Sequence, residues 1–207
     1  MSTLRRVFDR EVMSAVLDHG MSAVEPIRRD LLSGARGRVI EIGLGSGTNV
    51  PFYPKEVDEL VGVEPNEGLR ESAARKLARF DRPHRLIDAS ASRELPLDGA
   101  SFDVAVITFV LCSVRDVRKV IGNTLRVLKP GAPILLLEHV AAPDRRRRMV
   151  QLALRPAWSL ALGGCDPARP TRALIREAGL DDRDLRDTAL DLPFPVSTGL
   201  VGVARAR

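Results

Sequence analysis

The chain has 207 residues, of which 44% are hydrophobic, and its formal net charge at pH 7 is +5. This apolar fraction and small net charge exclude an intrinsically disordered protein, and the length suits one domain. The longest uncharged apolar stretch, residues 104–114, is far shorter than the roughly 20 residues that a membrane-spanning helix needs.

The first residues predict the cellular compartment, and the compartment in turn predicts the state of the cysteines. The first ten residues are rich in charge, and no apolar segment follows them, so they do not resemble a secretory signal. We therefore expect a soluble, cytoplasmic protein with reduced cysteines. Two cysteines cannot form a metal cluster alone, and with only three histidines a dedicated zinc site is not expected.

Amphipathic segments come first. Apolar residues recur at helical spacing over residues 4–19 and end at Gly20, which predicts a first helix. Ser22 and Glu25 have the spacing of a capping box, which predicts a second helix that Gly34 closes. These N-terminal helices, within residues 1–36, are expected to lie over one edge of a sheet.

Short apolar segments then alternate with helical patterns. Near-continuous apolar strands separated by helices are typical of a parallel sheet that is buried on both faces. Right-handed crossovers place the helices on both sides of such a sheet. The predicted strands cover residues 38–42, 60–63, 85–87, 103–109 and 134–137, and the predicted helices cover residues 67–80 and 115–128.

After residue 140 the pattern changes. Residues 145–148 are four arginines, and an apolar stretch follows them. A basic amphipathic helix on a membrane surface is one interpretation. We favour a solvated face, because Pro156 is expected to interrupt any long helix.

The remaining pattern completes one α/β domain over residues 1–207, with an insertion at residues 141–165. A helix is predicted over residues 170–178, where Gly179 ends it. Two strand-like segments, residues 185–190 and 198–204, are joined by a proline-rich turn, which suits a hairpin rather than another crossover helix.

The strongest motif is a glycine loop, Glu41-Ile-Gly-Leu-Gly-Ser-Gly47, which begins in the first strand. Its three glycines permit a tight turn and the close approach of a ligand. The loop is neither a dinucleotide fingerprint, since residue 48 is Thr, nor a phosphate-binding P-loop, since no lysine follows. Glu64 ends the second strand, where a carboxylate can accept hydrogen bonds from both hydroxyls of a ribose. Together they predict a nucleoside ligand, and the alternative is a purely structural loop.

The loop is accompanied by Glu64-Pro65 and by residues 95–103 and 128–131. In this combination the chain resembles the class I S-adenosylmethionine-dependent methyltransferases, and within them the quinone-biosynthesis-type small-molecule group. Several shorter stretches are similar, more narrowly, to the methyltransferase-like thiol methyltransferases and their bacterial relatives: residues 49–54, 111–114, 138–142, 156–158 and 163–165. The resemblance spans roughly residues 8–205. It implies a Rossmann-like, doubly wound, seven-stranded sheet with an antiparallel last strand.

The resemblance also implies S-adenosylmethionine as the cofactor and assigns residues to it. Where the family has an acid-alanine pair beside the adenine, this chain has Ser90-Ala91, so we expect backbone contacts from Ala91 and Ser92 instead. Thr108 would border the sulfonium. The other implied contacts are Glu41, Gly43, Gly45 and Gly47 with the methionine part, and Glu64 with Pro65 at the ribose.

Three residues are candidates for the acceptor side. His139 follows the fifth strand at its carboxyl end, and the ordinary pKa of histidine, about 6.5, suits a base. The alternative is a structural histidine. The insertion at residues 141–165 is expected to lie toward the acceptor pocket. Its residues Trp158 and Cys165 are candidates for the wall of that pocket, with core packing as the alternative for each.

The favoured acceptor is a small-molecule thiol, and a phenol or quinone-like acceptor is the alternative. We expect no nucleic-acid substrate. The segment after the fourth strand lacks an Asn/Asp-Pro-Pro-Tyr box, and aromatic residues for stacking bases are scarce. A non-catalytic cofactor-binding protein is the remaining alternative, although the glycine loop and Glu64 are intact.

Overall fold

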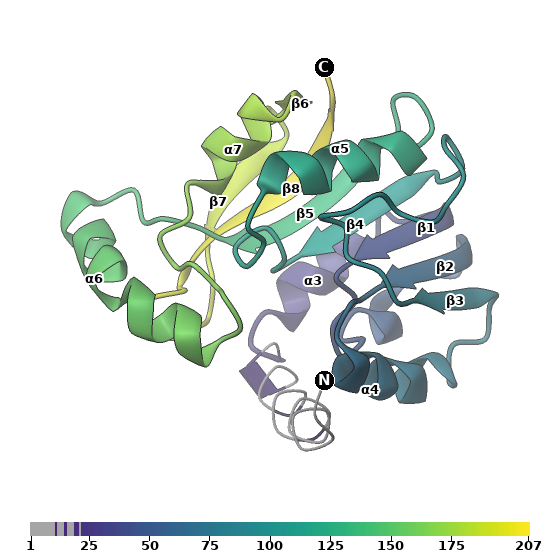
Figure 1. The fold of residues 1–207 in the computed structure, drawn as a ribbon, viewed down its shortest axis with the longest axis horizontal. Coiled ribbons are helices and arrows are strands. Elements are labelled where there is room, and N and C mark those ends of the chain that lie inside the picture. The colour runs from purple at the N-terminus through teal and green to yellow at the C-terminus, as the bar shows by residue number, and fades with distance from the viewer. Residues whose placement is uncertain (1–10, 12–14, 16–18, 21) are drawn as a thin grey trace.

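The computed structural model describes residues 11, 15, 19–20 and 22–207 (Figure 1). The helix predicted over residues 4–19 lies largely outside the described residues. The helices are α3 (Glu25–Leu32), α4 (Glu67–Leu77), α5 (Val117–Val127), α6 (Arg145–Ala161) and α7 (Thr171–Glu177), with a 3-10 turn, η2 (Val50–Phe52). The strands are β1 (Gly37–Ile42), β2 (Val57–Val63), β3 (His84–Ile87), β4 (Val104–Thr108), β5 (Ile134–His139), β6 (Leu180–Asp181), β7 (Leu185–Ala189) and β8 (Thr198–Ala206).

The strands form one sheet in the order β3-β2-β1-β4-β5-β8, in which β1 to β5 pair in parallel. Strand β8 is antiparallel to β5. Because β5 occupies one edge of β8, the short strands β6 and β7 share the other edge, one after the other. The sheet is therefore seven strand positions wide, which confirms the predicted doubly wound sheet with an antiparallel last strand. The two-residue strand β6 was not predicted.

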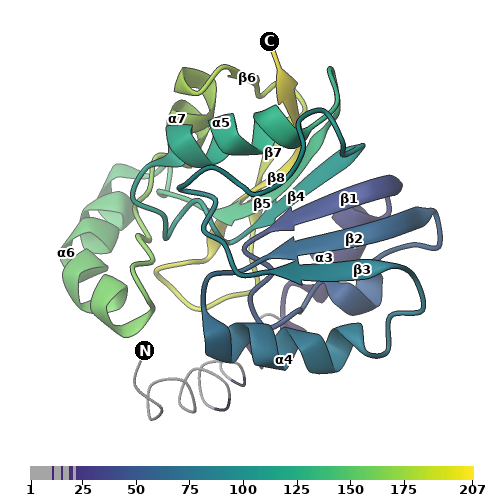
Figure 2. The same cartoon turned by 45° about the vertical axis from the view of Figure 1, so that its right-hand side comes forward.

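Helices cover both faces of the sheet (Figures 1 and 2). On one face, α5 and α7 pack Ile121 and Ile175 against alternate residues of the central strands. On the other face, α3 and α4 contribute Leu32 and Leu77 to a second core layer. The expectation that the N-terminal helices cover an edge is wrong for α3, because its buried leucines pack onto a face of the sheet, against β5.

The first residues of the helices show which predicted capping interactions are formed. The predicted capping box is wrong, since Ser22 donates instead to the carbonyl of His19 at 2.7 Å. Helix α3 begins without a side-chain cap and has a proline in its first turn, a position that needs no backbone donor. Asn66 and Asp116 do cap α4 and α5, because each side chain accepts a backbone N–H of the first turn.

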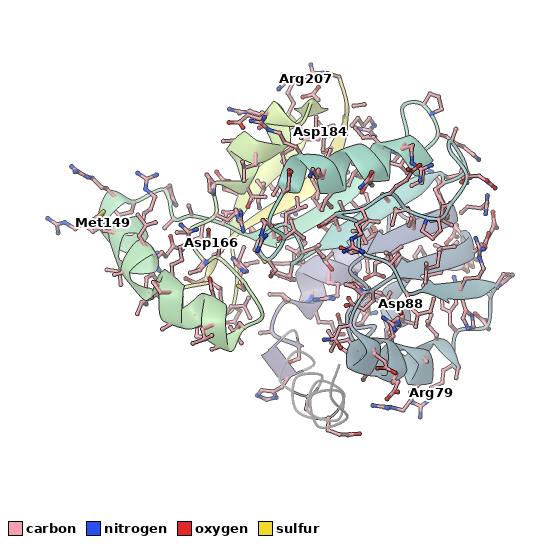
Figure 3. The ribbon with its side chains drawn as sticks, in the orientation of Figure 1. Arg79, Asp88, Met149, Asp166, Asp184 and Arg207 are labelled. Carbon is pink, nitrogen blue, oxygen red and sulfur yellow. The ribbon has the colours of Figure 1, made fainter. Side chains whose placement is uncertain are left out.

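Helix α6 projects beyond the sheet and runs through Pro156 (Figures 1 and 2). The expectation that Pro156 interrupts it is therefore wrong. The helix is largely exposed, so water can satisfy the carbonyl that the proline leaves without a donor. Exposed apolar side chains along it include Met149, which points away from the body (Figure 3), and Leu160. Within the described residues, no helix is long and apolar enough to cross a membrane.

Candidate active site

A cavity of about 380 Å³ opens at the carboxyl ends of β1, β2 and β4. Ligands of open α/β sheets bind at this edge. The sequence-predicted residues that line it are Gly43, Gly45, Glu64, Pro65, Ala91, Ser92 and Thr108. The other predicted residues, Glu41, Gly47, His139, Trp158 and Cys165, are not among the lining residues.

The glycine loop forms the floor of the cavity. Gly43 and Gly45 have φ of +68° and +59°, in the left-handed region that favours glycine. A Cβ added to Gly43 would lie 2.5 Å from a methyl carbon of Val110. Gly47, with φ of +80°, faces Ala73 of α4 instead. The loop therefore has open space beside Gly45 and packs closely against its neighbours at Gly43 and Gly47.

Glu64 is held by the loop that it faces. Its two carboxylate oxygens accept the N–H of Gly45 at 3.0 Å and that of Asn66 at 2.9 Å. The side chain is buried, with 7% exposure, and burial raises the pKa of its carboxyl while these two bonds oppose the rise. Each oxygen has a second lone pair for a ligand hydroxyl.

The segment after β3 forms the third side of the cavity. The Asn123 side chain donates to the carbonyls of Ala91 and Arg93 at 2.8 and 2.7 Å, which fixes the backbone there. Asp88 forms a two-pronged ion pair with Arg70, both contacts being 2.9 Å. The backbone contacts predicted from Ala91 and Ser92 remain a prediction.

Glu41 lies behind the loop. Its carboxylate accepts hydrogen bonds from Asn49 Nδ2 at 2.7 Å and from the Tyr53 hydroxyl at 2.6 Å. Burial is the main cause that raises its pKa to about 7. These contacts make Glu41 part of the scaffold that orients the loop, and its predicted contact with the methionine part remains a prediction.

Arg28 of α3 is a lining residue that the sequence did not single out. It is 1% exposed, and its guanidinium donates to Thr48 Oγ1 at 2.7 Å and to Asn49 Oδ1 at 2.6 Å. Only the folded chain brings this helix to the glycine loop, so no local motif marks Arg28. With Glu64 it supplies the charge among the lining residues that the structure describes.

The remaining side of the cavity, called here the acceptor-side wall, is largely apolar; it consists of Phe109, Val110, Ser113, Val114, Leu162 and Gly163. The ring of Phe109 stacks on that of His139, with centroids 6.2 Å apart. Nε2 of His139 lies 3.0 Å from Sγ of Cys165, and Nε1 of Trp158 donates to the same sulfur at 3.2 Å. The three acceptor-side candidates therefore lie together, behind the wall rather than on it.

Comparison with known proteins identifies the class. Residues 40–136 match the family model described as a methyltransferase domain. A solved SAM-dependent methyltransferase of Thermotoga maritima, called a possible histamine N-methyltransferase, shares the fold with a TM-score of 0.68 at 20% identity, over 100% of both chains. The fold is thus that of the class I methyltransferases.

Sequence relatives narrow the class to a family. The thiol S-methyltransferase TMT1B of Rattus norvegicus is 31% identical, over 84% of this chain and 75% of that protein. TMT1B of Homo sapiens is 35% identical, over 84% of this chain and 73% of that protein. The chain therefore belongs to the class I S-adenosylmethionine-dependent methyltransferases, in the family that includes these TMT1B proteins. Its cofactor is S-adenosylmethionine.

Proposed function

We propose that this enzyme transfers the methyl group of S-adenosylmethionine to the thiol sulfur of a small, apolar acceptor. The observation that carries the proposal is the similarity to two thiol S-methyltransferases along 84% of the chain. The apolar side chains of the acceptor-side wall, Phe109, Val114 and Leu162, support an acceptor with a hydrophobic body.

The cavity fits the cofactor on observations of its own. Gly45 carries no Cβ where the loop meets the cavity and has no other atom nearer than 3.9 Å to that position, so a ligand can approach the backbone. Glu64 would hold the ribose hydroxyls, and Ala91 with Ser92 would contact the adenine. Arg28 would hold the carboxylate of the methionine part, because a guanidinium matches a carboxylate in charge and shape.

The charge of the cavity favours a thiol over a phenol. When bound, the cofactor supplies an activated methyl group on a positively charged sulfur. Among the described lining residues, the charged side chains are Arg28 and Glu64, and both are assigned to the cofactor, so the acceptor would lose its proton without a charged base on the cavity lining. At pH 7.5 about 10% of a thiol with pKa near 8.5 is ionised, against about 0.3% of a phenol with pKa near 10.

Two segments outside the central sheet would complete the acceptor pocket. Arg28 comes from α3, and Leu162 with Gly163 comes from the insertion at residues 141–165. We assign to both segments the task of excluding water, and to the insertion the task of holding the acceptor in line with the methyl group, which accelerates transfer by positioning. In this account His139 supports the wall through Phe109, and a role as base stays a prediction.

A matched acceptor panel tests the proposal. Benzyl mercaptan, benzyl alcohol, 4-methylphenol and a quinol are each incubated with enzyme and S-adenosylmethionine, and S-adenosylhomocysteine and methylated products are measured by mass spectrometry. We expect turnover with the thiol, at a rate that rises with pH toward the thiol pKa. Turnover with the phenol or quinol alone would establish the alternative acceptor class. No turnover, despite cofactor binding, would indicate a non-catalytic cofactor-binding protein.

A substitution in the acceptor-side wall, compared with the same substitution on an exposed helix, tests where the acceptor binds. Val114→Phe fills part of the acceptor side and is expected to raise the KM for the thiol while leaving S-adenosylhomocysteine binding within about twofold. Val150→Phe, on the exposed face of α6, serves as the control. Equal effects of the two substitutions on KM would argue against an acceptor site at this wall.

A further inference from the structure

Three side chains that commonly bind transition metals meet behind the acceptor-side wall. Cys112 follows β4, His139 ends β5 and Cys165 follows α6. One ligand atom from each lies within 4.8 Å of the other two. All three are buried, with exposures of 1%, 4% and 8%. The sequence did not predict this grouping, because 26 or more residues separate its members.

The spacing suits a tetrahedral metal site. Zinc–sulfur bonds of about 2.3 Å and zinc–nitrogen bonds of about 2.0 Å place neighbouring ligand atoms about 3.5–3.8 Å apart. Nε2 of His139 and Sγ of Cys165 are 3.0 Å apart, and the other pairs lie within 4.8 Å. Adjustments of up to about 1 Å, within reach of side-chain rotation, would place all three atoms on one ion.

The surroundings of the cluster favour a thiolate. The Trp158 indole N–H donates to Sγ of Cys165 at 3.2 Å, as outer hydrogen bonds do to metal-bound sulfur. Nδ1 of His139 is buried with no hydrogen-bond partner among the described atoms, so the ring makes its polar contact on the cluster side.

We propose that Cys112, His139 and Cys165 bind a zinc ion. Thiolate and imidazole donors select zinc over magnesium and calcium, which prefer oxygen ligands. No fourth histidine, cysteine or carboxylate of the described residues joins the group, which leaves one coordination position for a ligand from outside these side chains. Metal uptake displaces the thiol protons of Cys112 and Cys165, which pass to the solvent, so binding releases protons.

The ion would join the insertion to the sheet. The Ser159 hydroxyl of α6 donates to the carbonyl of Cys165 at 2.7 Å, and the N–H of Asp166 donates to the carbonyl of Cys112 at 3.0 Å. Figure 3 labels Asp166 between α6 and the sheet. Zinc would add a stronger link at the same junction, next to the wall residues Leu162 and Gly163. The proposal does not depend on the identity of the methyl acceptor.

Metal content and cobalt spectroscopy test the site. The full chain is purified in a phosphine reductant without chelator, and its zinc is measured by plasma mass spectrometry. The stripped protein is then titrated with Co²⁺, whose thiolate charge-transfer band reports cysteine ligation. Because the chain has only two cysteines, we expect one ion per chain, and Cys112→Ser or Cys165→Ser should halve the band. His139→Ala should keep the band but weaken binding at least about tenfold.

His84→Ala is the control, since His84 is exposed and lies outside the cluster, and it should bind cobalt as the parent does. Binding of S-adenosylhomocysteine by each variant shows that it is folded. Zinc should also raise the Tm of the parent protein and slow hydrogen exchange over residues 159–169, but not in Cys165→Ser. Reduced, folded protein that shows no cobalt–thiolate band, or a band that Cys165→Ser leaves unchanged, would overturn the proposal.

Discussion

Replacing Glu64 with glutamine tests the ribose contact, because this change keeps the shape of the side chain and removes its charge. The carboxylate accepts the N–H of Gly45 and of Asn66 through different oxygens. In Glu64→Gln, one carboxylate oxygen becomes an amide NH₂, which cannot accept a hydrogen bond. The backbone N–H and the ligand hydroxyl that donate to the replaced oxygen then cannot both keep their hydrogen bonds. One hydrogen bond to a charged acceptor, about 1.5–3 kcal/mol, is therefore lost.

This loss corresponds to roughly 10- to 150-fold weaker binding of S-adenosylhomocysteine, measured by isothermal titration calorimetry. Glu59→Gln is the control, since Glu59 lies on the same strand but pairs with Arg38 and Arg85 away from the cavity. The control should bind within about twofold of the parent. If folded Glu64→Gln also binds within twofold, the assignment of Glu64 to the ribose is refuted.

Three further predictions concern the glycine loop and the residues that support it. Gly43→Ala should lower the free energy of unfolding by about 2–4 kcal/mol, since the new Cβ would clash with Val110 at a positive φ. Gly45→Ala should lower it by only about 1 kcal/mol, because no atom lies nearer than 3.9 Å to the new Cβ. Equal losses in thermal denaturation would contradict this. Arg28→Gln should weaken S-adenosylhomocysteine binding at least about tenfold while exposed Arg29→Gln does not, and calorimetry that finds no difference would remove Arg28 from the cofactor site. The pKa of Glu41 is about 7 in the folded chain against an ordinary 4.5, so only the folded state takes up this proton between these values. The free energy of unfolding should therefore rise by about 1 kcal/mol as the pH falls from 8 to 6. Glu41→Gln should lose this part of the rise in urea titrations, and an unchanged pH dependence would count against it.

The fold was predictable where the signal is local. Apolar strands separated by amphipathic helices predicted β1 to β5 and their parallel direction, because burial on both faces leaves a continuous apolar pattern. Pro156 was misleading, since α6 is exposed enough to tolerate the missing donor. Ser22 has the correct spacing for a cap but bonds backward to His19, which spacing alone does not reveal.

The residues of the candidate site were likewise predictable only where a local sequence motif marks them. The glycine loop and Glu64 were found because each stands at a strand end that one sequence motif marks. Arg28 was missed, because it reaches the cavity through contacts between segments that are distant in the sequence. The approach of Cys112 to His139 and Cys165 is likewise a product of tertiary structure.

The most direct measurement of the central claim follows the methyl group itself. The enzyme is incubated with S-adenosylmethionine that carries a trideuterated methyl group and with benzyl mercaptan, and both products are quantified by mass spectrometry. We expect one trideuterated benzyl methyl thioether for each S-adenosylhomocysteine, in a reaction that Glu64→Gln slows. Formation of S-adenosylhomocysteine without the labelled thioether, or no turnover by protein that binds S-adenosylhomocysteine, would contradict it.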